Sequence, residues 1–187
     1  MNSLFFKAIF VAIIGLGLLS PQLGEAGKGG SKTVNMSYAG SGIDTHFDSN
    51  GDGLYVSLSQ ATGKGTFGKF AIAITAEFGP PGDYGNCHET LPGVLNFPLV
   101  SSEAVYTFAD QSQLFAIQSG GYLCLNENAG NYMGQVEGDY VGGTGRFEGA
   151  TGTFTSPFDG QFLGNPDVGF RSIEGTVEGT VNNVSKK

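Results

Sequence analysis

The sequence is poor in the residues that most catalytic and binding motifs require. Among its 187 residues tryptophan is absent, cysteine and histidine occur twice each, and Lys plus Arg number 9 against 17 acids. The net charge of −8 argues against nucleic acid and anionic membranes, which both need a basic surface. The sequence contains neither a Gly-x-Ser-x-Gly elbow nor a Gly-Lys-Ser/Thr phosphate loop, so it indicates neither a serine hydrolase nor a nucleotide-binding protein.

Long apolar runs are missing except at the start of the chain. Lys7 precedes an apolar run from Ala8 to Leu19, and a polar segment from Ser20 to Ala26 ends in small residues. Crossing a bilayer takes about 20 apolar residues, and this run is shorter. We therefore predict that residues 1–26 are a cleaved signal peptide, with a retained membrane anchor as the alternative. The mature protein is expected to be soluble and either periplasmic or secreted.

The rest of the composition predicts one all-β domain. Glycine is abundant, at 32 residues, and occurs beside 15 Phe and 7 Tyr with few helix-forming residues. Such a chain favours short strands joined by tight turns, and the glycines lack the three-residue period of collagen. We expect a flexible leader at 27–32, one domain at 33–182 and a polar tail at 183–187.

Several segments alternate between apolar and polar residues with period two, as half-buried strands do. The clearest are 70–78, 134–140 and 173–181, and further strands are expected at 34–38, 54–59, 94–100, 104–108, 114–125 and 154–162. Eight or nine antiparallel strands in one domain must protect their edges. We therefore predict a closed antiparallel β-barrel of about eight strands, with a two-layer β-sandwich as the alternative.

Cys87 and Cys124 are the cysteines of the chain. In an exported protein the default expectation is one disulfide between them, which would stabilise the domain by about 4 kcal/mol. Two alternatives remain open from the sequence: a pair of free buried thiols, and a metal site shared with His88.

The segment from Gly142 to Gly152, GGTGRFEGATG, is the most distinctive string. A glycine-threonine-glycine turn leads into Arg146 and Phe147, and a second small-residue turn ends in glycine. With the strand residues that follow, it resembles the signature of the allene oxide cyclase-like and dirigent-like β-barrel superfamily, here as a secreted, bacterial-type member of unknown function. The resemblance implies a fold but not an activity. From physical chemistry, the glycines permit tight turns, Phe147 and Phe154 point inward, and Arg146 pairs with a carboxylate.

The segment from Asp48 to Gly53, DSNGDG, reproduces the start of a calcium loop. Oxygen side chains alternate and glycine occupies the sixth position. The tentative ligands are Asp48, Asn50, Asp52 and the Leu54 carbonyl, and the twelfth position, normally a bidentate Glu, is Ser59. The alternative is a turn whose carboxylates hydrogen-bond the backbone. Calcium is thus the one cofactor that the sequence suggests.

Catalytic residues cannot be assigned from the sequence. His46 and His88 lie in no recognisable motif, and the position of His46, Arg146 or Arg171 in the sequence gives none of them a catalytic role. The leading hypothesis is an exported non-catalytic barrel that binds a small apolar ligand or a partner. The alternative is a cyclase-like or dirigent-like enzyme that guides cyclisation or coupling of a small substrate inside the barrel.

Overall fold

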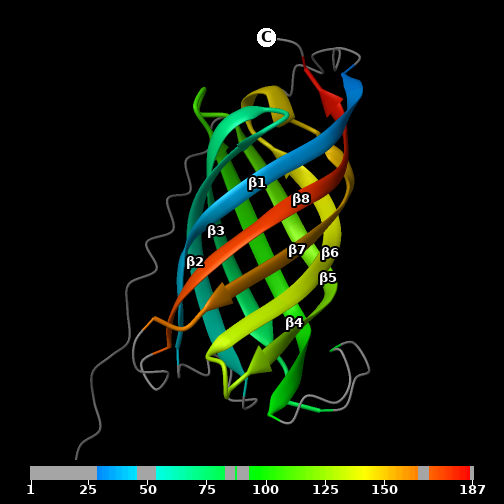
Figure 1. Ribbon diagram of the computed structural model, residues 1–187. Coiled ribbons are helices and arrows are strands. Elements are labelled where there is room, and N and C mark those ends of the chain that lie inside the picture. Colours follow the sequence, from blue (N-terminus) through cyan, green and yellow to red (C-terminus); the bar gives the residue numbers. More distant parts are fainter. Residues whose placement is uncertain (1–28, 46–53, 83–86, 88–92, 164–168, 186–187) are drawn as a thin grey trace, which may run out of the picture.

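The computed structural model describes residues 29–45, 54–82, 87, 93–163 and 169–185. These residues form β1 (Gly30–Asp44), β2 (Tyr55–Gly65), β3 (Gly68–Phe78), β4 (Val94–Phe108), β5 (Gln113–Asn126), β6 (Asn131–Gly143), η1 (Gly145–Phe147), β7 (Thr151–Gln161) and β8 (Phe170–Val184). Each strand pairs with the next and β8 pairs with β1, which closes the barrel (Figure 1). The predicted closed antiparallel barrel of eight strands is confirmed, and the sandwich alternative is wrong. Among the described residues no helix is long and apolar enough to cross a membrane.

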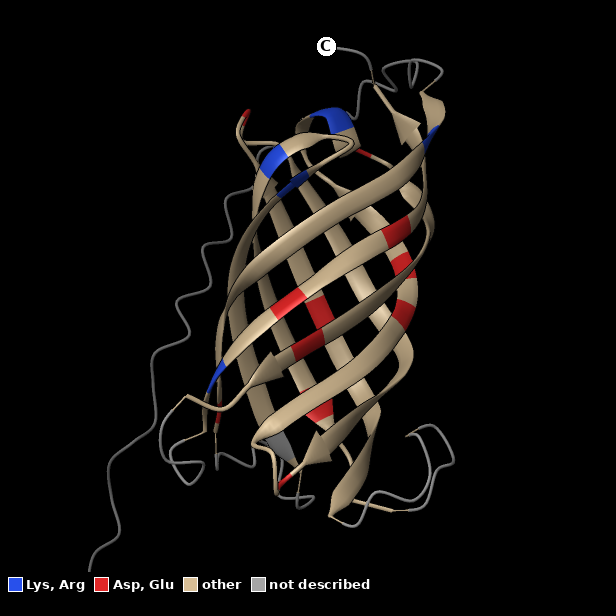
Figure 2. Ribbon diagram, in the orientation of Figure 1, with Lys and Arg blue, Asp and Glu red and all other residues tan. Residues whose placement is uncertain are grey.

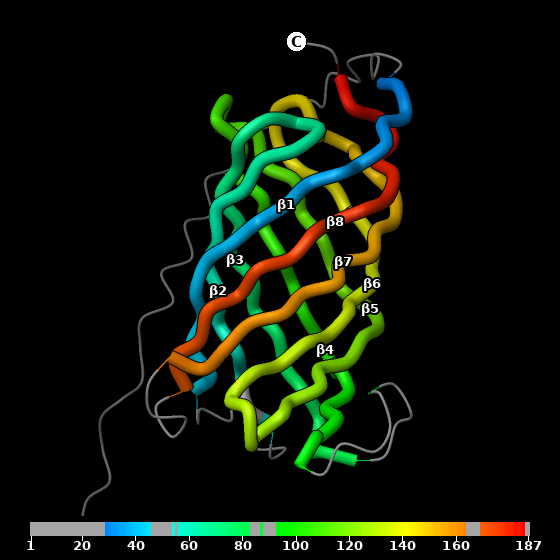
Figure 3. The backbone as a smooth tube through the Cα atoms, viewed as in Figure 1, coloured from blue at the N-terminus to red at the C-terminus, as the bar shows by residue number. Residues whose placement is uncertain are grey.

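Closure rests on β1, which pairs with β8 along its length and with β2 from Met36 to Asp44 (Figure 3). Tyr38, for example, lies opposite Gly63 on one side and Gly175 on the other. Because every described strand has a neighbour on each side, the described part of the chain has no edge strand. The pairing reaches from Gly30 to Val184, so strands begin and end slightly outside the expected bounds of 33–182.

The structure joins two of the expected strands into one. Residues 94–100 and 104–108 both belong to β4, which contains a bulge where Glu77 faces Ser101 and Phe78 faces Leu99. Val100 is the extra residue, and its side chain points outward and is exposed. A bulge shifts the alternation by one residue, which is why the sequence pattern breaks there.

The two ends of the barrel differ. At what we call the plugged end lie the β2–β3 and β4–β5 turns together with η1; at the mouth end lie the β5–β6 turn and the connection from β3 to β4 (Figure 1). The side chains that fill the interior come from alternate positions of every strand. The largest fully buried ones are Tyr106, Tyr140, Phe108, Phe147, Met36 and Leu114.

Inward-facing glycines make room for these aromatic side chains. Gly63 lies opposite Phe70 on the neighbouring strand, and Gly134 lies opposite Phe158. A Cβ atom at either glycine would overlap the ring of its partner. Tyr38 stands in the same relation to Gly175. The glycine content therefore follows from fitting large rings inside a narrow, strongly coiled barrel.

Candidate functional site

The plugged end is closed by aromatic rings around a guanidinium group. Phe147 packs edge-to-face against Phe67 and at a tilt against Phe108, with ring centroids 5.2 and 4.9 Å apart respectively. The Cζ atom of Arg146 lies 4.8 Å from the ring centroids of both Phe108 and Phe147. These contacts fill the barrel opening with side chains and exclude this end as an entrance.

Arg146 is also held by polar groups. Its Nη2 donates to the Phe67 carbonyl oxygen at 2.8 Å, and its Nε lies 3.6 Å from Asp110 Oδ2. Gly145 and Gly149, on either side, have positive φ angles of 59° and 67°. The glycine-rich string therefore builds a cap: its glycines turn the chain, Phe147 enters the core, and Arg146 pairs with a carboxylate as predicted.

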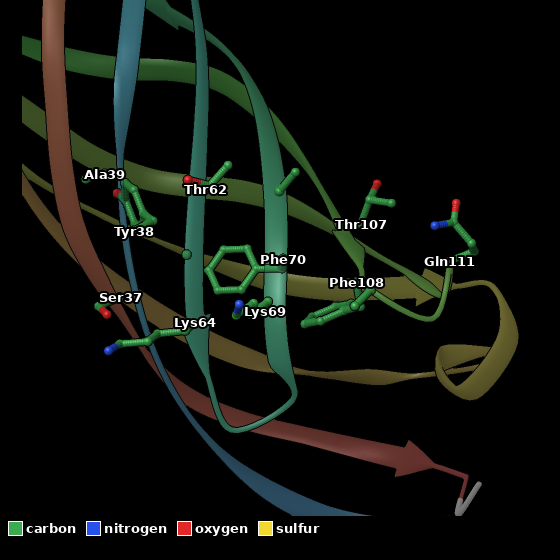
Figure 4. A pocket seen from close by; sticks show the side chains of 13 residues that line it. Ser37, Tyr38, Ala39, Thr62, Lys64, Lys69, Phe70, Thr107, Phe108 and Gln111 are labelled. Atoms are coloured by element: carbon green, nitrogen blue, oxygen red, sulfur yellow. The ribbon is translucent and has the colours of Figure 1, made fainter.

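One large hollow lies on the outer wall. Its volume is about 750 Å³, and it is located over β1 to β4 beside the β2–β3 turn (Figure 4). Exposed, short or flexible side chains such as Ser37, Thr62, Lys64 and Lys69 form much of its lining. An open groove of this kind buries little of a small molecule, so it is a poor candidate for a ligand site.

A smaller cavity opens at the mouth end and has a different character. Its volume is about 290 Å³, at the lower limit of ligand pockets in proteins. Apolar side chains from four strands and three connections dominate its lining, which includes Leu54, Val56, Phe78, Pro80, Pro81, Phe97, Leu123, Leu125 and Phe162. The polar members of the lining are Asp44, Ser57, Tyr132 and Arg171. This mouth cavity is the candidate functional site.

Arg171 is the central polar residue of the mouth cavity. It lies at the start of β8 and faces inward, and it is only 4% exposed. Its Nε is 3.2 Å from Asp44 Oδ1, and its Nη2 donates to the hydroxyls of Ser57 and, at 3.2 Å, Ser59. A buried charge persists only when it is paired and hydrogen-bonded, and these three residues supply that environment.

Tyr132 covers one face of the guanidinium. The Arg171 Cζ lies 5.2 Å from the Tyr132 ring centroid, and the Tyr132 hydroxyl donates to the carbonyl oxygen of Ser172. Burial raises the pKa of Tyr132 to about 12, and the neighbouring positive charge of Arg171 only partly opposes this shift. The phenol is therefore neutral throughout the ordinary pH range.

Polar side chains are also buried inside the barrel. Tyr38 and Ser156 share a hydrogen bond of 3.2 Å, and Ser102 and Gln118, which face each other across β4 and β5, are buried. The hydroxyls of Ser102 and Tyr140 have no hydrogen-bond partner among the described residues. Water is the usual partner of such buried polar groups.

The predicted site residues are distributed as follows. Cys87 and Cys124 form a disulfide with their Cα atoms 5.5 Å apart, which excludes the free-thiol and metal-site alternatives. Leu54 lines the mouth cavity. The remaining calcium candidates Asp48, Asn50 and Asp52, with both histidines, His46 and His88, lie outside the described residues.

Sequence reasoning did not find the mouth cavity, although some of its residues carried a signal. In β6, Tyr132 lies two residues before Gly134 and so faces inward with Gly134 and Val136. In β8, Arg171 lies two residues before Ile173 and faces inward in the same way. An arginine at an inward position of a strand is unusual enough to mark a site. The meeting of Arg171 with Ser57 and Asp44 depends on the strand register and could not be derived from the pattern alone.

Comparison with known proteins adds a likeness of fold. No protein-family model and no curated protein matches the chain. Among solved structures, a pterocarpan synthase dirigent protein is similar, with a TM-score of 0.41 and 12% identity over 88% of this chain and 95% of that one. So low an identity carries over no ligand, reaction or residue role.

Proposed function

We propose that this protein is an exported, non-catalytic barrel that binds a small, mostly apolar molecule in the mouth cavity. The observation that carries the proposal is the contrast between the two ends of the barrel. Aromatic rings fill the plugged end, whereas the mouth end keeps a cavity of about 290 Å³ lined mainly by apolar side chains. Exposed apolar surface in a concave, preformed site is the usual mark of small-molecule binding.

The disulfide supports the export part of the proposal. Cystine bonds persist in oxidising compartments and are rare in the cytosol. The Cys87–Cys124 bond joins the connection between β3 and β4 to β5. It agrees with the expected signal peptide at residues 1–26, which lies outside the described residues.

The chemistry of the lining favours binding over catalysis. Arginine side chains in general have no basic site to offer as a proton acceptor, and the raised pKa of Tyr132 keeps its phenol neutral. Neither group can therefore exchange a proton readily near neutral pH, as a general acid or base must. Both are suited to hydrogen-bonding and orienting a bound molecule.

A second candidate function is a cyclase-like or dirigent-like enzyme that guides cyclisation or coupling of a small substrate. The polar groups of the mouth cavity favour it, because a guidance enzyme needs a shaped apolar space with a few inward polar contacts. Release of a bound test ligand unchanged would support the binding role; its conversion to a cyclised or coupled product would support the enzyme.

The proposed function can be tested with an uncharged solvatochromic dye such as Nile red. We expect a saturable rise in dye fluorescence with one dye bound per chain. Leu123→Trp, which fills the mouth cavity, should reduce the affinity at least tenfold. Leu58→Trp is the matched control, since Leu58 lies on the outer face of β2 and is 44% exposed. Absence of saturable binding, or equal binding by both variants, would contradict the proposal.

A further inference from the structure

We propose that the ligand of the mouth cavity is an amphipathic organic anion whose carboxylate binds to the guanidinium of Arg171. This inference rests on the proposed function and specifies the chemical class of the ligand. The juxtaposition that carries it is a nearly buried arginine in an otherwise apolar cavity, with a counter-ion that only partly satisfies it.

The arginine and its counter-ion are buried to very different extents. The side chain of Arg171 is 5% exposed and that of Asp44 is 40% exposed. Asp44 therefore lies at the cavity rim, where water competes for its carboxylate, while the positive charge lies deeper. Removing a guanidinium from water is costly, so a second anionic group that reaches it inside the cavity gains more than it would at the surface.

The contacts of the guanidinium leave room for a stronger partner. Asp44 approaches Nε at 3.2 Å, yet Nε makes no aligned hydrogen bond with any described residue. The partners of Nη2 are the neutral hydroxyls of Ser57 and Ser59. Arginine binds carboxylates best through two parallel hydrogen bonds, and no described residue provides that arrangement. A ligand carboxylate can supply it, with Ser57 in the lining as an additional hydrogen-bonding group.

The distribution of the other charges makes Arg171 distinctive. The other described basic residues, Lys32, Lys64, Lys69 and Arg146, lie toward the plugged end (Figure 2). The outer faces of β6 to β8 carry acids, among them Glu137, Asp139 and Glu178. With a net charge of −8, the outer surface repels organic anions. Selective binding of an anion at the mouth end would therefore have to come from Arg171.

The test compares octanoate with 1-octanol, which share an alkyl chain and differ in the polar group. Each is titrated at pH 8 against the Nile red complex of the wild-type protein. The measured quantity is the dissociation constant of octanol divided by that of octanoate. We expect octanoate to bind at least tenfold more tightly, because a charge-assisted pair with a buried arginine is among the stronger polar contacts in proteins.

Three variants locate the source of the preference. Arg171→Gln should reduce the ratio to about one, whereas Arg146→Gln, which removes the arginine of the plugged end, should leave it unchanged. Asp44→Asn should raise the ratio, since it removes the carboxylate that competes for Arg171. The last variant keeps the buried arginine, so it tests the inference even if Arg171→Gln fails to fold.

The possible outcomes separate the inference from the proposed function. If octanol displaces the dye and octanoate is no better, the carboxylate assignment is wrong and apolar binding stands. If octanoate still binds more tightly than octanol in folded Arg171→Gln, or if the ratio falls in Asp44→Asn, the assignment of the carboxylate to Arg171 is wrong. If neither compound nor the dye binds, the proposed function fails and takes this inference with it.

Discussion

Gly63 and Phe70 face each other across β2 and β3, and the phenyl ring occupies the space that a side chain at residue 63 would need. The same relation recurs between Gly134 and Phe158. In this barrel a glycine on one strand is thus the complement of an aromatic residue on the next. Glycine is used here for space, since neither Gly63 nor Gly134 has a positive φ.

This pairing predicts that adding a methyl group at Gly63 is costly. Gly63→Ala would drive Cβ into the Phe70 ring and toward the backbone of Ser37, so neither neighbour can yield without distorting a strand. We expect a loss of about 1–3 kcal/mol, with a fall of several degrees in the thermal midpoint. Gly30→Ala is the control, because nothing lies within 4 Å of a Cβ there. Equal midpoints for the two variants would show that the packing of the Phe70 ring does not require the space beside Gly63.

The disulfide offers a second prediction, about the mouth end. Cys87 and Cys124 are separated by 37 positions in sequence, so the bond closes a long loop. Replacing both with serine should cost about 4 kcal/mol by the chain-entropy model and lower the thermal midpoint by about 8–16 °C. A reducing agent should have the same effect on the wild type and none on the double variant. A wild-type midpoint insensitive to full reduction would contradict this expectation.

The disulfide also restrains the wall of the mouth cavity. Pro80 and Pro81, in the connection that contains Cys87, are part of the cavity lining. Gly82 of the same connection pairs with Asn96 of β4. Reduction should therefore weaken Nile red binding at temperatures well below the midpoint, since one wall loses a covalent restraint.

The fold could be predicted from the sequence because alternation with period two is a local property. Segments such as 70–78 and 173–181 show it directly, and the need to protect strand edges then favours closure. The string GGTGRFEGATG was assigned correctly as turns around an inward Phe147. The bulge at Val100 misled the pattern by splitting β4 into two expected strands, and the expected strands 34–38 and 54–59 fell short of β1 and β2.

The mouth cavity could not be predicted in the same way. Whether space remains inside a barrel depends on the summed volumes of the inward side chains at each height along the barrel axis. The height of a residue along that axis depends on the strand register. Asp44 and Ser57 face each other across β1 and β2, but Arg171 is far from both in sequence and meets them only through the pairing of β8 with β1. The alternation alone says that Arg171 faces inward, but not which groups surround it.

Buried tyrosines predict a loss of stability at high pH. Burial raises the pKa of Tyr132 to about 12 and that of Tyr106 well above its ordinary value of 10.0. A group whose pKa is higher in the folded state contributes stability that is complete below the unfolded pKa and is lost as the pH rises toward the folded one. The thermal midpoint should therefore fall between about pH 10 and pH 12.

Tyr132→Phe separates this titration from other effects of alkali. The variant lacks the hydrogen bond to Ser172, so its midpoint should be lower than that of the wild type below about pH 10. Its decline between about pH 10 and pH 12 should, however, be shallower than that of the wild type, because one ionisable phenol is gone. Parallel curves for the two proteins would show that Tyr132 does not contribute to the alkaline transition.

Calcium provides the last prediction, which follows from the sequence of residues 48–53. If Asp48, Asn50, Asp52 and the Leu54 carbonyl bind the ion with an extracellular-type dissociation constant of about 10⁻⁴ to 10⁻³ M, millimolar calcium should stabilise the mature protein. At about ten times the dissociation constant the gain is about 1.4 kcal/mol, or a few degrees in the thermal midpoint. The measurement compares residues 27–187 in calcium and in excess chelator.

A double variant, Asp48→Ala with Asp52→Ala, decides whether this segment is responsible for such a shift. Its midpoint should be the same in calcium and in chelator, whereas Glu137→Ala with Asp139→Ala, which removes the same charge from the outer face of β6, should keep the full shift. A shift that persists in the first pair would place the ion elsewhere. No shift in the wild type would contradict calcium binding and favour the alternative, a turn at residues 48–53 whose carboxylates hydrogen-bond the backbone. The mouth cavity would then remain as the candidate site.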